Sequence, residues 1–321
     1  MSGCWAGLDA QVRLRADLRL MGSDFALTAV ATDSSTASAA IAAGIQEIQR
    51  IEGRISSWAE DSETSAINRA AGTSPTPVST ELFQLINRAS KVSALTEGAF
   101  DLTFGPLMRC WPLRDSSFQW PDSALVRKVR KLVGYQQIEL DREASTVFLP
   151  QQGMQIGFGA IGKGYAANRA RTIMQAFGLQ GGMVNAGGDL TCWGDDLNQT
   201  GWTIGISDPG NTERIHTRLQ INNLAVVTSG DYINYILHNG IRYSHILDPR
   251  TGYPVVNMSS VTVICSDAEL ADALATGVSV MGATEGINLL EQLREIEGII
   301  LTGDGQILQT SGVKRMRASK D

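Results

Sequence analysis

A glycine-rich segment with a single lysine is the first stretch of this sequence that could do chemistry. Residues 157–164 read GFGAIGKG, and the pattern after them predicts a helix that ends near Phe177. Glycines at the start of a helix leave backbone N–H groups free to bind an anion, and Lys163 adds a point charge suited to a phosphate. We therefore expect a phosphate-binding turn here; the alternative is an ordinary glycine-rich helix start with a solvated lysine.

Two well-known nucleotide motifs match this segment in letters but not in context. As a dinucleotide fingerprint it should follow a strand and precede an acidic residue by about 20 positions, yet 150–155 is a poor strand and the next acid is Asp189. As a P-loop it should end in Ser or Thr, and Gly164 stands there instead. The sequence thus favours a phosphate site outside both of these folds.

An acid and a hydroxyl lie on one face of a later predicted helix. Asp272 and Thr276 are four residues apart within the apolar stretch ADALATG, so they share a helical face. Carboxylate and hydroxyl oxygens are the hard ligands that Mg²⁺ takes, although magnesium needs about six of them. The alternative is a buried helix of small residues in which the threonine bonds its own backbone. Because an acid on an apolar face is costly without a partner, we favour a functional reading.

A histidine lies next to a tight turn further along the chain. His245 precedes the sequence DPRTG, in which proline and glycine are typical of a turn. A histidine near neutral pH can act as a general base. A structural histidine is an equally good interpretation from the residues alone.

Composition limits the class of protein. The chain has 321 residues, 43% hydrophobic and 19% charged, with a net charge of -6 and 6% aromatic residues. These values exclude a disordered or fibrous chain and argue against a nucleic-acid partner. The four cysteines are far apart and are expected to be reduced and mostly buried. No run is apolar and long enough to predict a transmembrane segment.

The elements that position these residues form helices first, then strands, then a mixture. This order predicts an α+β fold with mixed, largely antiparallel sheets and packed helices. Ile41, Ile45, Ile48 and Ile51 recur at helical spacing, with Ser34, Ser35 or Thr36 as the expected cap. The expected helices are 36–55, 80–95, 123–133, one that follows the glycine-rich segment 157–164 and ends near Phe177, 267–281 and 284–295. The expected strands or hairpins are 18–32, 135–149, several within 183–265, 298–302 and 306–310.

Taken together and in order, seven motifs resemble the ApbE-type FAD:protein FMN transferase family. No single motif is decisive, but seven in register over most of the chain are specific. They are LMGS (20–23), GAFD (98–101), GAIGKGY (159–165), NAGGD (185–189), TSGDY (228–232), HILDPRTG (245–252) and ADALAT (271–276).

The resemblance implies a reaction, a T-fold-like architecture and a set of site residues. Family members use Mg²⁺ and FAD, transfer FMN to a threonine hydroxyl of an acceptor protein and release AMP. By motif position, the metal would be held by Asp272, Thr276 and the backbone carbonyl of Ala160. Residues along the FAD would be Met21, Ala99, Phe100, Asp101, Lys163 and Ile246, and the catalytic set would be His245, Lys163 and Asp272.

The sequence departs from the family pattern at two positions. Gly157 stands where the family usually has an aspartate expected to touch the flavin nucleotide, and Ala275 stands where some members have a second acid. Without the aspartate at position 157, FAD affinity or selectivity is expected to differ from the family's. Without an acid at position 275, the metal site is expected to have fewer protein ligands and more water. Two alternatives stay open: an FAD pyrophosphatase that yields FMN and AMP, and a non-catalytic flavin-binding protein.

We expect one domain over 18–313, preceded by an extension (1–17) and followed by a polar tail (314–321). The expected location is cytoplasmic. The segment SGC at 2–4 resembles the end of a lipoprotein cleavage site, so a periplasmic lipoprotein anchored at Cys4 is the alternative.

Overall fold

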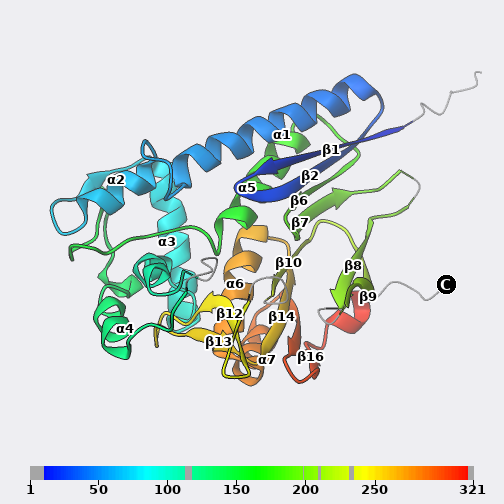
Figure 1. The fold of residues 1–321 in the computed structure, drawn as a ribbon. Coiled ribbons are helices and arrows are strands. Elements are labelled where there is room, and N and C mark those ends of the chain that lie inside the picture. Colours follow the sequence, from blue (N-terminus) through cyan, green and yellow to red (C-terminus); the bar gives the residue numbers. More distant parts are fainter. Residues whose placement is uncertain (1–10, 113–117, 198, 209–210, 231–234, 317–321) are drawn as a thin grey trace, which may run out of the picture.

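An eight-stranded sheet, antiparallel throughout, runs through the centre of the computed structural model, which describes residues 11–112, 118–197, 199–208, 211–230 and 235–316 (Figure 1). The strand order is β1-β2-β6-β7-β10-β14-β15-β16. The α+β fold predicted from the sequence is confirmed. The strands are β1 (Val12–Leu20), β2 (Ser23–Ala31), β6 (Gly181–Ala186), β7 (Asp189–Gly194), β10 (Ala225–Gly230), β14 (Met258–Cys265), β15 (Glu297–Thr302) and β16 (Ile307–Gln309).

The sheet begins with a hairpin whose turn holds Met21. Strands β1 and β2 pair along their whole length, and Met21 (φ 50°) and Gly22 (φ 71°) form the turn. The backbone N–H of Met21 donates to Glu52 Oε1 at 2.9 Å, which ties the turn to the following helix. The predicted domain boundary at residue 18 lies inside β1, because the strand begins at Val12.

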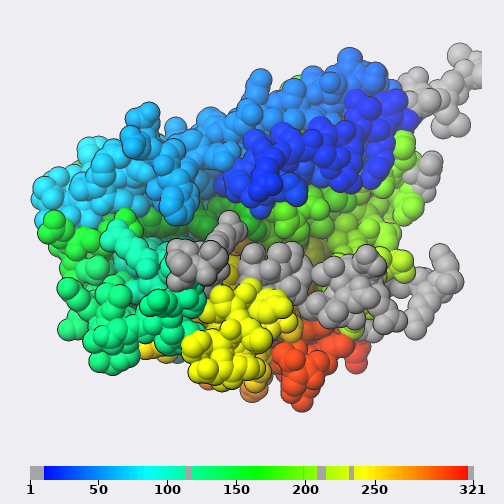
Figure 2. Space-filling view, viewed as in Figure 1, coloured from blue at the N-terminus to red at the C-terminus, as the bar shows by residue number. Residues whose placement is uncertain are grey.

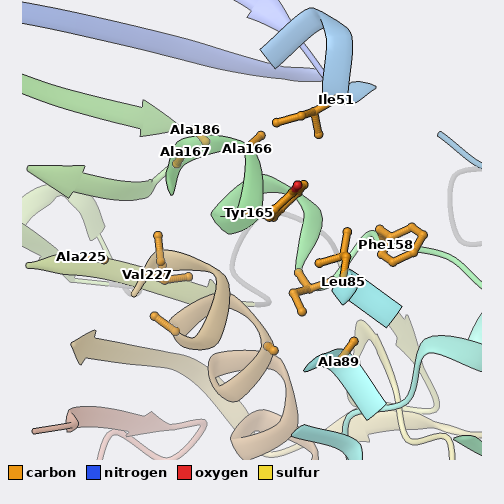
Figure 3. Packing of buried hydrophobic residues seen from close by; sticks show 14 of the residues in the cluster. Ile51, Leu85, Ala89, Phe158, Tyr165, Ala166, Ala167, Ala186, Ala225 and Val227 are labelled. Atoms are coloured by element: carbon orange, nitrogen blue, oxygen red, sulfur yellow. The ribbon is translucent and has the colours of Figure 1, made fainter. Parts of the chain in front are cut away.

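Four helices cover one face of the sheet and follow the order of the strands beneath them. These are α1 (Ser34–Ile55), α5 (Gly162–Gln175), α6 (Ala268–Met281) and α7 (Ala283–Gln292). Helix α5 lies between α1 and α6, and Figure 3 shows Tyr165 and Ala166 of α5 between Ile51 of α1 and Leu85. The core therefore forms around α5, which carries the glycine-lysine segment.

Helix α1 confirms the isoleucine periodicity and corrects its cap. Ile41, Ile48 and Ile51 are buried, as the helical spacing predicts. The cap is Asp33, whose side chain accepts from the Thr36 N–H at 2.9 Å, so the expected serine or threonine caps are wrong by one to three positions. An aspartate is at least as good a cap because its oxygen reaches the same free N–H groups.

The opposite face of the sheet packs against a separate β-ribbon. Strands β8 (Trp202–Asp208) and β9 (Asn211–Ile221) pair with each other and bury Trp202, Ile204 and Leu219 against Val30 and Val226 of the sheet. The sheet thus has apolar side chains on both faces, which excludes water from the strands that carry the site.

A smaller part of the fold lies beside the sheet and includes the strand of His245. It contains α3 (Thr80–Leu95), α4 (Ser123–Arg130) and the three-stranded sheet β11 (Tyr235–His238), β12 (Ile241–Leu247) and β13 (Pro254–Val256). The sequence did not predict α2 (Glu63–Ala70) or the 3₁₀ helix η1 (Leu102–Arg109). The remaining elements are β3 (Thr76–Pro77), η2 (Tyr135–Gln137), β4 (Glu139–Asp141), β5 (Thr146–Phe148) and η3 (Val313–Met316).

A charged network joins three helices around Tyr165. Glu81 of α3 accepts from two Arg50 nitrogens, both at 2.8 Å, from Arg54, and from the Tyr165 hydroxyl. The hydrogen bonds from Arg50 are the main reason that the pKa of Glu81 falls to about 2. The network fixes the first turns of α5 against α1 and α3.

Three of the expected buried thiols are observed. Cys110, Cys192 and Cys265 are free and buried, and Cys4 lies outside the described residues. Burial raises the pKa of Cys192 to about 12 and of Cys265 to about 11, so neither is a nucleophile near neutral pH. Across the described ranges, none of the helices has the length and hydropathy that a membrane span requires.

Candidate functional site

The glycine-lysine segment and the acidic helix meet where α5 begins. The backbone N–H of Gly164 donates to Asp272 Oδ2 at 3.0 Å, although the two residues are 108 positions apart. A Cβ atom on Gly164 would lie 2.1 Å from the Ala268 carbonyl oxygen, so only glycine allows α5 to approach α6 this closely. The structure therefore brings together two of the motifs that the sequence singled out.

Asp272 is a buried acid with few charges to offset it. Its residue is 3% exposed, and burial raises its pKa, while the Lys163 ammonium and the Gly164 N–H act in the opposite direction. A buried carboxylate is costly unless it is paired or bound to a metal. A bound cation would offset this cost.

Lys163 forms an ion pair that the sequence did not predict. Its ammonium donates to Asp189 Oδ2, and Asp189 is only 2% exposed. Asp189 opens β7 directly after the turn of Gly187 and Gly188, which both have positive φ. The NAGGD motif signalled a turn, but its partner lies 26 residues earlier in the chain, so spacing could not reveal it. With all three groups ionised, Asp189, Lys163 and Asp272 carry one net negative charge, which a cation would offset.

Thr276 and Ser229 add hydroxyl oxygens next to Asp272. Their side-chain oxygens are 3.4 Å apart, and Ser229 comes from the end of β10. Ser229 was within a motif but had no predicted role. Asp231 and Tyr232 of the same motif lie outside the described residues.

His245 lies on β12, in the three-stranded sheet and not in the eight-stranded sheet that carries Ser229. Its neighbours Ser244 and Ile246 line a narrow niche together with Ser229, and α6 contacts β12. The side chain of His245 is exposed, so a substrate or a partner could reach it. The strand is held in place by the turn that follows it, where the Trp111 indole N–H donates to the Gly252 carbonyl at 2.8 Å.

The donor set fits a hard cation such as Mg²⁺. Gly164 lies in the first turn of α5, where the N–H groups have no partner within the helix, and its N–H donates to Asp272 instead. Within the described ranges, no three His, Cys, Asp or Glu side chains cluster as a metal site. A cation here would therefore rely on Asp272, neutral oxygens such as Thr276, and oxygens of a ligand.

The residues predicted along FAD are partly buried in the fold. Ala99 and Phe100 are 1% and 2% exposed. Both carboxylate oxygens of Asp101 accept protein hydrogen bonds: Oδ1 from the Thr103 N–H and hydroxyl at 2.8 and 2.6 Å, and Oδ2 from the Tyr135 N–H at 2.8 Å. Any contact from Asp101 to a ligand would therefore be additional to its role in capping η1.

An open cavity of about 100 Å³ lies beside Asp101. Gly98, Tyr135 and Arg250 line it with Asp101, so it joins the GAFD segment to the turn after His245. Figure 2 shows the yellow segment of β12 and β13 below the blue N-terminal part of the molecule. Of the residues predicted along FAD, Asp101 lines this cavity and Ile246 lines the niche beside Ser229. The contacts of all six with FAD stay predictions.

Gly157 has room for a side chain. The closest heavy atoms to a Cβ built there are Phe104 ring carbons at 3.9 Å, which is ordinary contact. Its N–H donates to the Leu102 carbonyl at 2.9 Å. Packing therefore does not explain why a glycine stands at position 157 where the family usually has an aspartate.

Comparison with known proteins identifies the class to which this fold and site belong. The sequence model of the ApbE family matches residues 21–300, so the chain belongs to the ApbE family. A FAD:protein FMN transferase of Klebsiella pneumoniae is 36% identical over 302 residues, covering 94% of this chain and 92% of the relative. A FAD:protein FMN transferase of Vibrio cholerae is 31% identical over 263 residues, covering 80% and 78%. The family to which the chain belongs is thus a family of transferases.

Solved structures of the family confirm the fold. The ApbE protein of Thermotoga maritima superimposes with a TM-score of 0.87 at 30% identity, covering 96% of this chain and all of that one. The flavin transferase ApbE of Vibrio cholerae gives a TM-score of 0.85 at 26% identity, covering 95% and 99%. The family resemblance found from seven motifs is confirmed.

Proposed function

We propose that this chain transfers FMN from FAD to a threonine hydroxyl of an acceptor protein, with Mg²⁺, and releases AMP. The observation that carries the proposal is the hydrogen bond from the Gly164 N–H, next to Lys163 in the chain, to the buried Asp272, in a chain that belongs to the ApbE family. The curated relatives named above are FAD:protein FMN transferases, which supports FAD as the substrate.

The reaction exchanges the phosphoanhydride bond of FAD for a phosphoester bond to threonine. The threonine oxygen bonds to the phosphorus of the FMN part, and the bond from that phosphorus to the bridging oxygen of AMP breaks. The threonine loses its proton, and the electron pair of the broken bond leaves with AMP. Phosphoryl transfer of this kind depends on offsetting charge and on aligning the attacking oxygen.

This chain supplies groups for both requirements. The Lys163 ammonium pairs with the buried Asp189, and the lysine side chain is 28% exposed, so a ligand can reach part of it. Asp272, Thr276 and the Ala160 carbonyl are the residues that would hold Mg²⁺, which would supply positive charge to the pyrophosphate oxygens. His245 is exposed on β12 and is the proposed acceptor of the threonine proton.

The acceptor need not be part of this chain. The buried cysteines have raised thiol pKa values, and an incoming threonine would supply the nucleophile. The exposed position of His245 fits an attacking group that arrives from another protein.

The test is mass spectrometry of an acceptor domain with an Asp-x-x-Thr motif after incubation with the protein, FAD and Mg²⁺. The expected result is a mass gain equal to the FMN moiety on one threonine. AMP release without any acceptor, and no modified threonine, would indicate a pyrophosphatase instead. FAD binding with no AMP under either condition would indicate a flavin-binding protein.

Two variants test the roles proposed for Asp272 and His245. Asp272→Asn is expected to abolish transfer, and the exposed Asp61→Asn is the matched control that should leave it unchanged. His245→Ala is expected to lower kcat by about 100-fold, the range for a general base, with a smaller change in FAD affinity. Equal losses in both quantities would mean that His245 has a structural role only.

A further inference from the structure

The contact between α5 and α6 contains a second attachment, one turn beyond Gly164. The side-chain oxygen Oδ1 of Asn168 accepts from the Ala268 N–H at 3.0 Å, and its Nδ2 donates to Asp267 Oδ1 at 2.7 Å. The same Asp267 oxygen caps α6 by accepting from the Leu270 N–H at 3.1 Å. A single amide side chain on α5 thus binds both the cap and the first residue of α6.

The two attachments are spaced alike on both helices. On α5 they are Gly164 and Asn168, four residues apart, and on α6 they reach Asp272 and Ala268, also four residues apart. Residues at this spacing lie one above another on the same helix face. Two bonded points one turn apart fix both the rotation and the sliding of α5 on α6, whereas one point would leave α5 free to pivot.

The positions of Lys163 and Asp272, the two groups of the proposed reaction, depend on how α5 is aligned with α6. Lys163 immediately precedes Gly164 at the start of α5, and Asp272 lies one turn into α6. A shift of α5 along α6 would change the spacing between the ammonium and the buried carboxylate. A displacement of about 1 Å in such a constellation costs on the order of 100-fold in rate.

We propose that Asn168 is a positioning residue that sets the spacing of Lys163 and Asp272 by locking α5 to the cap of α6. The inference rests on the proposed function, in which these two groups act on one pyrophosphate. The role belongs to the amide specifically, because it needs one acceptor for the Ala268 N–H and one donor for Asp267.

The test compares three forms of the full-length protein. Asn168→Ala removes both bonds, and Asn168→Asp keeps the acceptor but places a carboxylate against that of Asp267. The exchanged pair, Asn168→Asp with Asp267→Asn, restores a donor facing an acceptor. Gln175→Ala, on an exposed position of the same helix, is the matched control.

Two quantities are measured on each form, together with its melting temperature. One is kcat for FMN transfer at saturating FAD. The other is the Kd for Mn²⁺, used as a probe for Mg²⁺ and measured by electron paramagnetic resonance without any turnover. Changes to residues that orient metal ligands typically cost about 10- to 100-fold in metal affinity or activity.

We expect both single variants at Asn168 to lose about 10-fold or more in kcat and in Mn²⁺ affinity. The exchanged pair should regain most of both losses, and Gln175→Ala should match the unmodified protein. A lower melting temperature with unchanged kcat and Mn²⁺ affinity would overturn the inference, as would an exchanged pair no better than Asn168→Asp. If the unmodified protein forms no FMN–threonine, the proposed function fails, while the Mn²⁺ affinities still decide the role of Asn168.

Discussion

Replacing Gly164 with alanine tests the closeness of α5 and α6 directly. The new Cβ would lie 2.1 Å from the Ala268 carbonyl oxygen and 2.8 Å from Asp272 Cβ, whereas real Cβ contacts are at least 3.0 Å. The helices must therefore move apart by about 1 Å. This movement stretches the Gly164–Asp272 hydrogen bond from its present 3.0 Å and separates Lys163 from the acid.

Two opposing contributions determine how Gly164→Ala changes the free energy of unfolding. Overpacking a tight contact costs about 1–3 kcal/mol, whereas alanine is favoured over glycine inside a helix by about 1 kcal/mol. We expect a net loss of up to about 2 kcal/mol, or about 4 °C in melting temperature. The effect on transfer should be larger, on the order of 100-fold in kcat, because the reacting groups are displaced.

The assay pairs thermal unfolding with kcat for FMN transfer, and Gly53→Ala is the control. Gly53 lies within α1, and a Cβ built there has no heavy atom within 4 Å, so this substitution should stabilise the protein by about 0.5–1 kcal/mol and leave kcat unchanged. A Gly164→Ala protein with normal kcat and melting temperature would refute the argument. A structure of that variant with an undisplaced α6 would do so as well.

Three further predictions concern the ion pairs and the missing family acid. Glu81→Gln should remove about 2–3 kcal/mol of stability at neutral pH, since the pKa of Glu81 is lowered to about 2. The stabilisation is complete above the unfolded carboxyl pKa of about 4.3 and is lost as the pH falls towards 2, so unfolding curves of the two proteins should converge across that window. Asp189→Asn should lower kcat by about 10-fold because Lys163 loses its buried partner, and an unchanged kcat would show that the pair is not needed to place the ammonium. Gly157→Asp should tighten FAD binding, measured by quenching of flavin fluorescence, because the Cβ fits and the family acid is restored; weaker binding would contradict the role inferred from the resemblance.

Local patterns in the sequence predicted most elements of the fold. The isoleucines of α1 and the apolar run of α6 have clear helical periods, and both helices are observed. The sequence did not predict helix α2 because most of its eight residues are polar and Ile67 is its one large apolar residue. A helical period is recognised only when it repeats over several turns, and this segment is too short for that.

The sequence suggested the residues of the candidate site but not their contacts. Lys163, Asp272 and Thr276 follow from residue type and motif, and the structure brings the first two together. The partners Asp189 and Ser229 come from strand ends, and they meet the site only through the strand order of the sheet. That order is a property of the whole chain, so no local spacing predicts it.

The placement of α6 has a consequence for how the protein matures during synthesis. Lys163 and Asp189 are made early, but Asp272 is made more than eighty residues later, in a helix that rests on β10 and β14. A nascent chain that ends before α6 therefore has the ammonium and its partner but lacks the buried acid of the site. If the proposed function holds, a chain that ends before α6 should therefore be inactive on FAD.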